Sequence, residues 1–204
     1  MPPETQAELE RLASRYALVA CLSGRTSEDA RRIVGVDRLT YVGVHGLELD
    51  PEAARWRGAL QELVAAAGWP EDETEDKGLT VSLHYRRAAD QDAARARLEQ
   101  IAEQARAAGF DPRFGRKVLE IRPLVEADKG TAVRHLLAEA RAGAGLYAGD
   151  DTTDLDAFRG LGEAGLDLAV RVAVSSAEAP PALREQADLV VEGPGGLRAL
   201  LHQL

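Results

Sequence analysis

Residues 149–154 hold three aspartates and two threonines directly after an apolar run. Two adjacent aspartates at the end of a strand suit Mg²⁺, because this ion takes hard oxygen ligands from one or two carboxylates together with water and phosphate. Asp150, Asp151 and Asp154 are therefore candidate metal ligands. A purely structural role is the alternative, since aspartate commonly caps the start of a helix.

Two further polar clusters follow apolar runs or open helices. Ser23 and Arg25 come after the run 16–22, and the Ser23 hydroxyl suits a phosphate oxygen at a strand-to-helix turn. Lys129, followed by Gly130, opens a helix, where free backbone N–H groups and an ammonium group favour an anion. A Ser-Gly pair is also common in ordinary turns. Taken together, the three clusters predict a magnesium-assisted phosphoryl site, in which positioning and charge neutralisation do most of the catalysis.

The elements around these clusters alternate between strand and helix patterns. Such alternation predicts a parallel sheet with crossover helices, and ligands of these sheets bind where the strands end. The predicted helices are 4–15, 26–34, 129–142, 154–161 and 195–204, and the predicted strands are 16–24, 38–46, 144–150, 166–174 and 187–193.

The pattern changes in the middle of the chain. Helices are predicted at 52–67 and 90–108, a strand of alternating polarity at 77–87, and a hairpin at 110–123 with Gly115 in its turn. Alternation indicates a sheet with one solvated face. The sequence thus predicts a core in two parts, 1–47 and 124–204, and an inserted α+β unit at 48–123.

The composition narrows the class of protein. The chain has 204 residues, 45% hydrophobic and 29% charged, which is typical of a globular domain, and its net charge of −9 argues against a nucleic-acid or anionic-membrane partner. No apolar run is long enough for a membrane span, and no signal peptide is evident. The single cysteine, Cys21, fits a reducing compartment, so we expect a cytoplasmic protein.

The order of the motifs resembles the trehalose-6-phosphate phosphatase family of the haloacid-dehalogenase-like phosphatases. The matching segments are "LSGR" (22–25), "GVHGLEL" (43–49), "EDKGLTVSLHYR" (75–86), "VLEIRP" (118–123), "DKGTAVRHLL" (128–137) and "YAGDDTTDLDAF" (147–158). They extend over nearly the whole chain. The resemblance implies an α/β fold with a doubly wound, Rossmann-like core and an inserted cap, and it implies a phosphorylated disaccharide as substrate.

The resemblance also implies roles for individual residues. Ser23 would bind the transferring phosphoryl group, Lys129 would offset its charge, and Asp150 would hold Mg²⁺. Asp151 and Asp154 would bind through water or orient the groups around the metal. The substrate-binding candidates are Arg25, His45 and the cap residues Lys77, His84, Arg86, Lys117, Glu120 and Arg122.

The cap residues and His45 also have structural interpretations. Arg86 fits a solvated strand end, Glu120 fits a pair with Lys117 or Arg122 across the hairpin, and His45 fits a packed histidine between glycines. Val44 departs from the family pattern, which usually has a polar residue there, so one substrate contact is missing or supplied elsewhere.

One part of the family's machinery is absent from the sequence. The resemblance implies covalent catalysis, in which one aspartate attacks phosphorus and a second, two residues later, acts as acid and base. Both belong to an Asp-x-Asp-Gly-Thr motif on the first core strand, and the sequence contains no such motif. We therefore expect the core to lack its first, central strand and residues 1–204 alone to be inactive. Either Met1 is an internal methionine of a longer active protein, which the intact remaining motifs favour, or the chain is a truncated regulatory module.

The function expected from these observations is Mg²⁺-dependent hydrolysis of trehalose 6-phosphate, with a trehalose-phosphate synthase as a possible partner. Two alternatives remain open. One is a phosphatase of the same superfamily that acts on another sugar phosphate, such as sucrose phosphate or a mannosyl derivative. The other is a non-catalytic module that binds a phosphosugar or regulates a partner.

Overall fold

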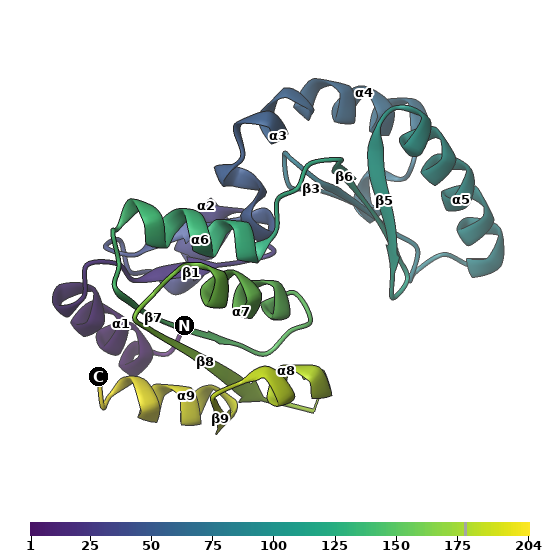
Figure 1. Cartoon of the computed structure of the whole chain (residues 1–204). Coiled ribbons are helices and arrows are strands. Elements are labelled where there is room, and N and C mark those ends of the chain that lie inside the picture. The colour runs from purple at the N-terminus through teal and green to yellow at the C-terminus, as the bar shows by residue number, and fades with distance from the viewer. Residues whose placement is uncertain (178) are drawn as a thin grey trace. The chain divides into compact units, whose positions relative to one another are not determined.

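The chain divides into two compact units. A computed structural model describes residues 1–177 and 179–204, and it places 1–49 with 127–204 in one unit, the core unit, and 50–126 in the other, the inserted unit (Figure 1). The sequence predicted boundaries at 48 and 123. The assignment of the inserted unit as a cap stays a prediction. None of the helices in the described residues is both long and apolar enough to cross a membrane.

The core unit alternates between helices and parallel strands. Its elements are α1 (Pro3–Arg15), β1 (Ala20–Leu22), α2 (Ser27–Val34), β2 (Thr40–Val42), the 3₁₀ segment η1 (Val44–Leu49), α6 (Lys129–Glu139), β7 (Ala144–Gly149), α7 (Asp154–Glu163), β8 (Leu168–Ser175), α8 (Pro181–Gln186), β9 (Leu189–Glu192) and α9 (Gly193–Leu201).

The helix boundaries follow from local capping. The Thr26 side chain accepts a hydrogen bond from the Asp29 backbone N–H, and α2 ends at Gly35, whose φ of 72° is left-handed. At α6, the Asp128 carboxylate accepts from the Thr131 N–H, and the Thr131 hydroxyl accepts from the Asp128 N–H, which completes a capping box. The start predicted at 129 is confirmed, and α2 begins one residue after the predicted position 26.

The parallel strands of the core unit form two separate sheets. β1 pairs with β2, and β7, β8 and β9 pair in that order. Within the described residues, β1 has no second neighbour and β7 pairs only with β8. Neither β1 nor β7 has a fully buried residue, whereas the second half of β8 is fully buried. The two strands therefore have the exposure of edge strands.

Helix α6 packs against both sheets. Its residues Ala132 and Leu136 contact Leu22 of β1, and Val133 lies in a cluster with Leu22 and Tyr147 of β7. One helix therefore joins two sheets that share no strand pairing among the residues that the structure describes. The parallel strands and crossover helices agree with the predicted doubly wound core, and the lack of a central strand stays a prediction.

Some predicted elements are wrong in length. The strands predicted at 16–24 and 38–46 are shorter in the structure, where they reduce to β1 and β2. Helix α8 and strand β3 of the inserted unit were not predicted, since both are short and lack a clear period.

The inserted unit is an antiparallel sheet covered by helices. Its elements are α3 (Pro51–Arg55), α4 (Arg57–Ala67), the 3₁₀ turn η2 (Glu71–Glu73), β3 (Thr74–Asp76), β4 (Val81–His84), α5 (Gln91–Ala107), β5 (Phe110–Gly115) and β6 (Val118–Pro123). The strand order is β3-β4-β6-β5. The helix predicted at 52–67 is two helices separated at Trp56, and the hairpin turn is formed by residues 116–117 with Gly115 closing β5.

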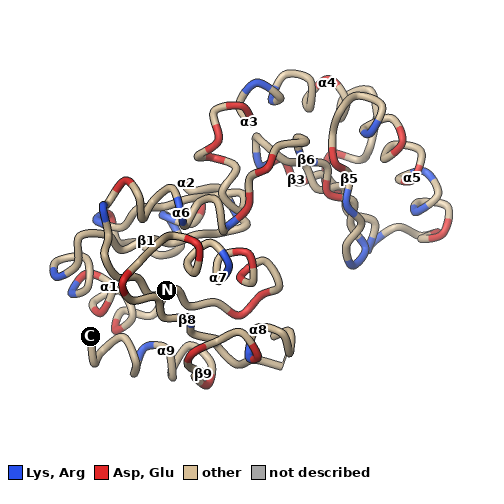
Figure 2. Tube along the Cα trace, viewed as in Figure 1, with Lys and Arg blue, Asp and Glu red and all other residues tan. Residues whose placement is uncertain are grey.

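One face of this sheet and the helices form the core of the inserted unit. Leu83 and Leu119 of the sheet pack with Leu98 and Ile101 of α5, all at most 3% exposed. Leu98, Ile101, Ala102 and Ala105 form the buried stripe of this helix. Basic and acidic residues follow one another along the rest of α5 (Figure 2). Along β4 and β6 polar residues alternate with these apolar ones, and the polar residues lie on the opposite face of the sheet.

Candidate functional site

Asp154 is the centre of a buried hydrogen-bond network. Its Oδ1 accepts from the Lys129 Nζ at 2.6 Å and from the Tyr147 hydroxyl at 2.7 Å. Its Oδ2 accepts from the backbone N–H groups of Asp150 and Asp151 at 2.8 and 2.9 Å. Asp154 is 3% exposed and Lys129 is 7% exposed. The carboxylate thus fixes both the lysine and the acidic loop that follows β7.

Three glycines allow this close packing. A Cβ on Gly149 would lie 2.2 Å from the Asp154 Cγ, so only glycine leaves space for the carboxylate beneath the loop. A Cβ on Gly160 of α7 would lie 2.3 Å from the Gly130 carbonyl oxygen of α6. Because the two helix backbones touch at this point, Lys129 at the start of α6 reaches Asp154 at the start of α7.

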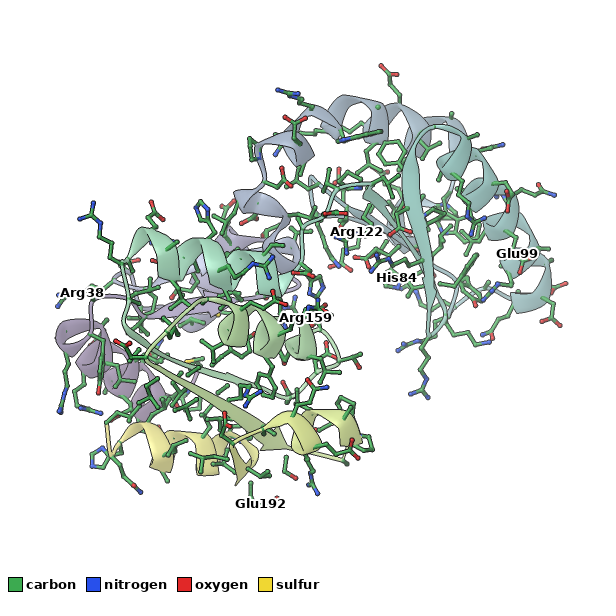
Figure 3. The ribbon with its side chains drawn as sticks, viewed as in Figure 1. Arg38, His84, Glu99, Arg122, Arg159 and Glu192 are labelled. Atoms are coloured by element: carbon green, nitrogen blue, oxygen red, sulfur yellow. The ribbon has the colours of Figure 1, made fainter. Side chains whose placement is uncertain are left out.

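An ion pair at the surface supports the same helix contact. Arg159 of α7 lies 3.3 Å from the Asp128 carboxylate at the N-cap of α6 and 2.8 Å from Asp156 (Figure 3). Its side chain is about half exposed, so the pair contributes little to stability by itself. The buried contacts beneath it determine the geometry of the two helix starts.

The charges in the network shift two pKa values. Burial disfavours the ionised form of Asp154, but the Lys129 ammonium and the hydrogen bonds to the carboxylate outweigh it, so the pKa of Asp154 lies below its ordinary value. Burial and the adjacent Asp154 charge raise the pKa of Tyr147 well above its ordinary value. At neutral pH the network therefore consists of a carboxylate, a neutral phenol and backbone donors around the lysine.

The three aspartates of the acidic loop have different surroundings. Within the described residues, both oxygens of Asp154 are occupied by donors, and the Asp151 Oδ1 accepts from the Thr152 N–H at 2.6 Å. The Asp150 carboxylate accepts no hydrogen bond from a described residue, and Asp150 is exposed. Asp150 is thus the aspartate available to a cation, and Asp154 is suited to orienting the loop.

The donor set fits a magnesium ion only in part. Within the described residues, no group of three His, Cys, Asp or Glu side chains converges as a metal site. Mg²⁺ commonly keeps several waters and needs only one or two protein carboxylates beside a phosphate. Asp150 can supply one such carboxylate. Further oxygen ligands would come from water, substrate or a residue outside this sequence.

Ser23 and His45 come together at the ends of β1 and β2. The Ser23 N–H donates to the Val42 carbonyl, and the His45 N–H donates to the Ser23 carbonyl at 2.9 Å. The Ser23 hydroxyl oxygen accepts from the Arg25 N–H at 3.0 Å, which leaves its proton for a ligand. The His45 ring lies against Gly24, where a Cβ would be 2.6 Å from Nε2. Arg25 is exposed on the same loop.

The predicted residues of the inserted unit form a group with Glu75. The Lys77 Nζ and the His84 Nε2 lie 3.9 and 3.4 Å from the Glu75 Oε2. Glu75, Ser82, Glu120 and Arg113 stand opposite one another across the four strands. Arg122 of β6 and His84 of β4 lie on the side of the sheet away from α5 (Figure 3).

The other two predicted residues, Lys117 and Arg86, lie apart from the residues that stand opposite one another across the sheet. The Lys117 ammonium lies over the Tyr85 ring, 5.6 Å from its centroid, and Lys117 occupies the hairpin turn with a φ of 63°. Arg86 is exposed in the loop after β4, and its side chain makes no hydrogen bond to a described residue. The structure therefore brings Lys77 and His84 together at Glu75, and it places Glu120 and Arg122 on the same face of the sheet as His84.

A shallow groove of about 440 Å³ lies elsewhere on the inserted unit. Trp69, Tyr85, Ala94 and Arg97 are among the residues that line it. Of the predicted site residues, only His84 borders the groove. The groove and the predicted site residues of the inserted unit are thus largely separate features.

Sequence reasoning missed three residues. Tyr147 was included in a motif but given no role, although an aromatic hydroxyl immediately before an acidic loop was a usable signal. Glu75 lies two residues before Lys77, and this spacing places both near one strand end. Glu48 was assigned to the inserted unit, but its carboxylate accepts hydrogen bonds from backbone N–H groups of the core unit.

Comparison with known proteins gives consistent matches. A family model described as trehalose-phosphatase matches residues 65–192. Trehalose-phosphate phosphatases of Mycobacterium avium and Mycobacterium marinum are 37% and 36% identical over 191 and 188 residues, each match covering 81% of this chain and 47% of the relative. The chain thus spans about half the length of these relatives.

Solved structures give the same fold. A trehalose-6-phosphate phosphatase related protein superposes with a TM-score of 0.75 at 22% identity, covering 100% of this chain and 86% of that one. A Candida albicans trehalose-6-phosphate phosphatase C-terminal domain has a TM-score of 0.65 at 20% identity, with 99% and 83% covered. A haloacid dehalogenase-like hydrolase from Bacteroides thetaiotaomicron reaches 0.64 at 14%, with 99% and 92% covered. The predicted fold class is confirmed. Because the family model matches more than half of the residues of this chain, the chain belongs to the trehalose-phosphatase family.

Proposed function

We propose that the chain forms the phosphate-binding and substrate-binding part of a Mg²⁺-dependent phosphatase that hydrolyses trehalose 6-phosphate. The observation that carries the proposal is the Asp154 network, which holds the Lys129 ammonium beside the acidic loop in a buried setting. A buried cation next to a free carboxylate suits a ligand that combines a phosphate with a divalent ion.

Each residue of the core unit has a distinct task in this proposal. Lys129 neutralises charge on the phosphoryl oxygens, and the Ser23 hydroxyl donates a hydrogen bond to one of them. Asp150 holds Mg²⁺, which supplies further charge neutralisation at the phosphoryl group. Asp154 keeps Lys129 and the acidic loop in place without itself contacting the metal.

The separation of the two parallel sheets supports a role for one more strand. β1 and β7 are both unpaired on one side among the described residues, and α6 packs against both. We propose that an extended parallel strand occupies this position and contributes the Asp-x-Asp-Gly-Thr aspartates. The nucleophile and the general acid/base then face Lys129 and Asp150 from the end of that strand.

Polar side chains of the inserted unit support recognition of the sugar. Lys77, His84, Glu120 and Arg122 offer donors and acceptors on one face of the sheet. We propose that these residues bind hydroxyl groups of the disaccharide, and that the inserted unit acts as a cap that shields the phosphoryl group from water. The relatives' names support a trehalose phosphate as the substrate. A trehalose-phosphate synthase partner remains part of the proposal.

Calorimetry with a panel of ligands tests the substrate. Trehalose 6-phosphate, sucrose 6-phosphate, glucose 6-phosphate and unphosphorylated trehalose are titrated into the chain with Mg²⁺ present. Tightest binding of trehalose 6-phosphate, weakened in Glu120→Gln and unchanged in Glu99→Gln, is the expected result. Glu99 is a matched control because it lies on α5, exposed and paired with Arg95 (Figure 3). Equal affinity for all three esters would contradict the substrate assignment.

A non-catalytic binding module is the second candidate, because the sequence contains no Asp-x-Asp-Gly-Thr motif. Both candidates predict binding of the ester by residues 1–204. They differ in what happens when the open reading frame is extended upstream of the Met1 codon. An in-frame apolar strand that ends in Asp-x-Asp-Gly-Thr favours the phosphatase, and an in-frame stop codon before any such motif favours the module.

A further inference from the structure

Glu48 connects the two loops that carry Ser23 and His45. Its Oε1 accepts a hydrogen bond from the Ser27 N–H at 2.9 Å, and its Oε2 accepts from the Gly43 N–H at 2.8 Å. One carboxylate therefore joins the start of α2 to the end of β2. We infer that Glu48 is a positioning residue for the phosphate-binding loop, an inference that rests on the proposed function.

The two segments joined by Glu48 touch directly. A Cβ on Gly43 would lie 2.3 Å from the Ser27 backbone nitrogen and 2.7 Å from the Arg25 carbonyl oxygen. The Val44 N–H donates to the Arg25 carbonyl at 2.8 Å. The Ser23 loop and the turn after β2 are therefore one packed unit, in which a shift of either segment moves the other.

The turn between Gly43 and Glu48 has an unfavourable backbone. Val44 and His45 have φ values of 49° and 56°, in the left-handed region that side chains with a Cβ seldom adopt. A β-branched valine is especially disfavoured there. Such a conformation persists only when the surrounding contacts hold it. The Glu48 carboxylate supplies two of these contacts: one closes the turn through the Gly43 N–H, and the other ties the turn to the Ser27 N–H at the start of α2.

The strained turn determines where the His45 ring lies. The ring packs against Gly24, and the His45 N–H donates to the Ser23 carbonyl. The Glu48 carboxylate accepts from the backbone N–H groups of Ser27 and Gly43, so it acts on Ser23 and His45 through the backbone. Removal of the carboxylate is expected to release the turn, and the release is expected to displace both the Ser23 hydroxyl and the imidazole.

Two variants and one control test this inference. Glu48→Gln keeps the size of the side chain but places an amide N–H₂ against one backbone donor, and Glu48→Ala removes both acceptors. Glu52→Gln is the control, because Glu52 is an exposed glutamate whose side chain pairs with Arg55. For each protein we would measure amide hydrogen exchange and the binding of inorganic phosphate by NMR titration, with and without MgCl₂.

The expected result is a local change. Exchange at the Ser27 and Gly43 amides should accelerate about tenfold in Glu48→Gln and more in Glu48→Ala, because each lost acceptor leaves a backbone donor open to water. Amides in β8 should keep their wild-type protection. Phosphate should bind about tenfold more weakly in Glu48→Gln and more weakly still in Glu48→Ala, and Glu52→Gln should match the wild type in both measurements.

Four outcomes would contradict parts of the account in different ways. Wild-type exchange at Ser27 and Gly43, or phosphate affinity that survives in both variants, would overturn the inference on Glu48. An equal loss of protection in β8 would also overturn it, because Glu48 would then stabilise the whole core unit. No phosphate binding by the wild-type chain would contradict the proposed function, and exchange at the two amides would then decide on Glu48 alone.

Discussion

Asp154→Asn is the substitution that tests the buried network most severely. Asp154 accepts hydrogen bonds from the Lys129 ammonium, the Tyr147 hydroxyl and two backbone N–H groups. An asparagine leaves the ammonium buried with no countercharge among its direct partners. Breaking a buried ion pair in this way costs about 3–5 kcal/mol. Urea unfolding followed by circular dichroism measures this loss in the free energy of unfolding.

Matched variants separate the ion pair from the surrounding structure. Asp156→Asn breaks the exposed pair with Arg159 and should cost less than about 1 kcal/mol. The double variant Lys129→Met with Asp154→Asn removes both charges, so its cost should be smaller than the sum of the two single costs. A loss for Asp154→Asn no larger than that for Asp156→Asn, or strictly additive single costs, would refute the reasoning.

The same network predicts a pH dependence. The pKa of Asp154 in the folded protein lies below its ordinary value of 3.8, so its contribution to stability is fully present above that value. The contribution is lost as the pH falls through the folded-state pKa. Between neutral pH and about pH 2 the wild type should therefore lose more stability than Asp154→Asn. Parallel pH profiles of the two proteins would contradict this assignment.

Two further substitutions address the packing around the network. Gly160→Ala would place a methyl group 2.3 Å from a carbonyl oxygen of α6 and should destabilise the core unit by about 1–3 kcal/mol. Gly162→Ala is the control in the same helix, because its methyl group would meet no atom within 4 Å, and it should be neutral or stabilising. Chemical denaturation of both variants checks this, and equal effects would argue against the helix contact. Tyr147→Phe removes a hydroxyl donor to Asp154 and should cost about 1–2 kcal/mol in the same assay. An unchanged free energy of unfolding would show that this hydrogen bond contributes nothing.

Much of the fold was predictable because the local signals agreed with one another. Helix α6 has a capping box and an apolar stripe, and α2 has a threonine cap and a glycine end. The strand β7 was predicted because its apolar run stops at an acidic loop. Short elements such as β3 and α8 were missed, since a few residues give no measurable period.

The identity of the site residues was more predictable than their individual roles. Residue types and order identified Lys129 and the three aspartates, but they did not distinguish a free carboxylate from one surrounded by donors. Only the three-dimensional contacts show that Asp154 is occupied and Asp150 is not. Likewise, Glu48 lies in the matching segment 43–49, but the sequence did not indicate its role, because its two partners are backbone N–H groups and one of them, at Ser27, is 21 residues away.

The central claim is that residues 1–204 bind the phosphorylated substrate but lack the group that attacks it. Release of inorganic phosphate from trehalose 6-phosphate by the purified chain, measured with Mg²⁺ present, tests this claim most directly. A Lys129→Met variant is measured in parallel to identify any contaminating phosphatase, because phosphate release by a contaminant does not depend on that substitution. We predict no release above the blank without protein. Mg²⁺-dependent release that disappears in Lys129→Met would contradict the account.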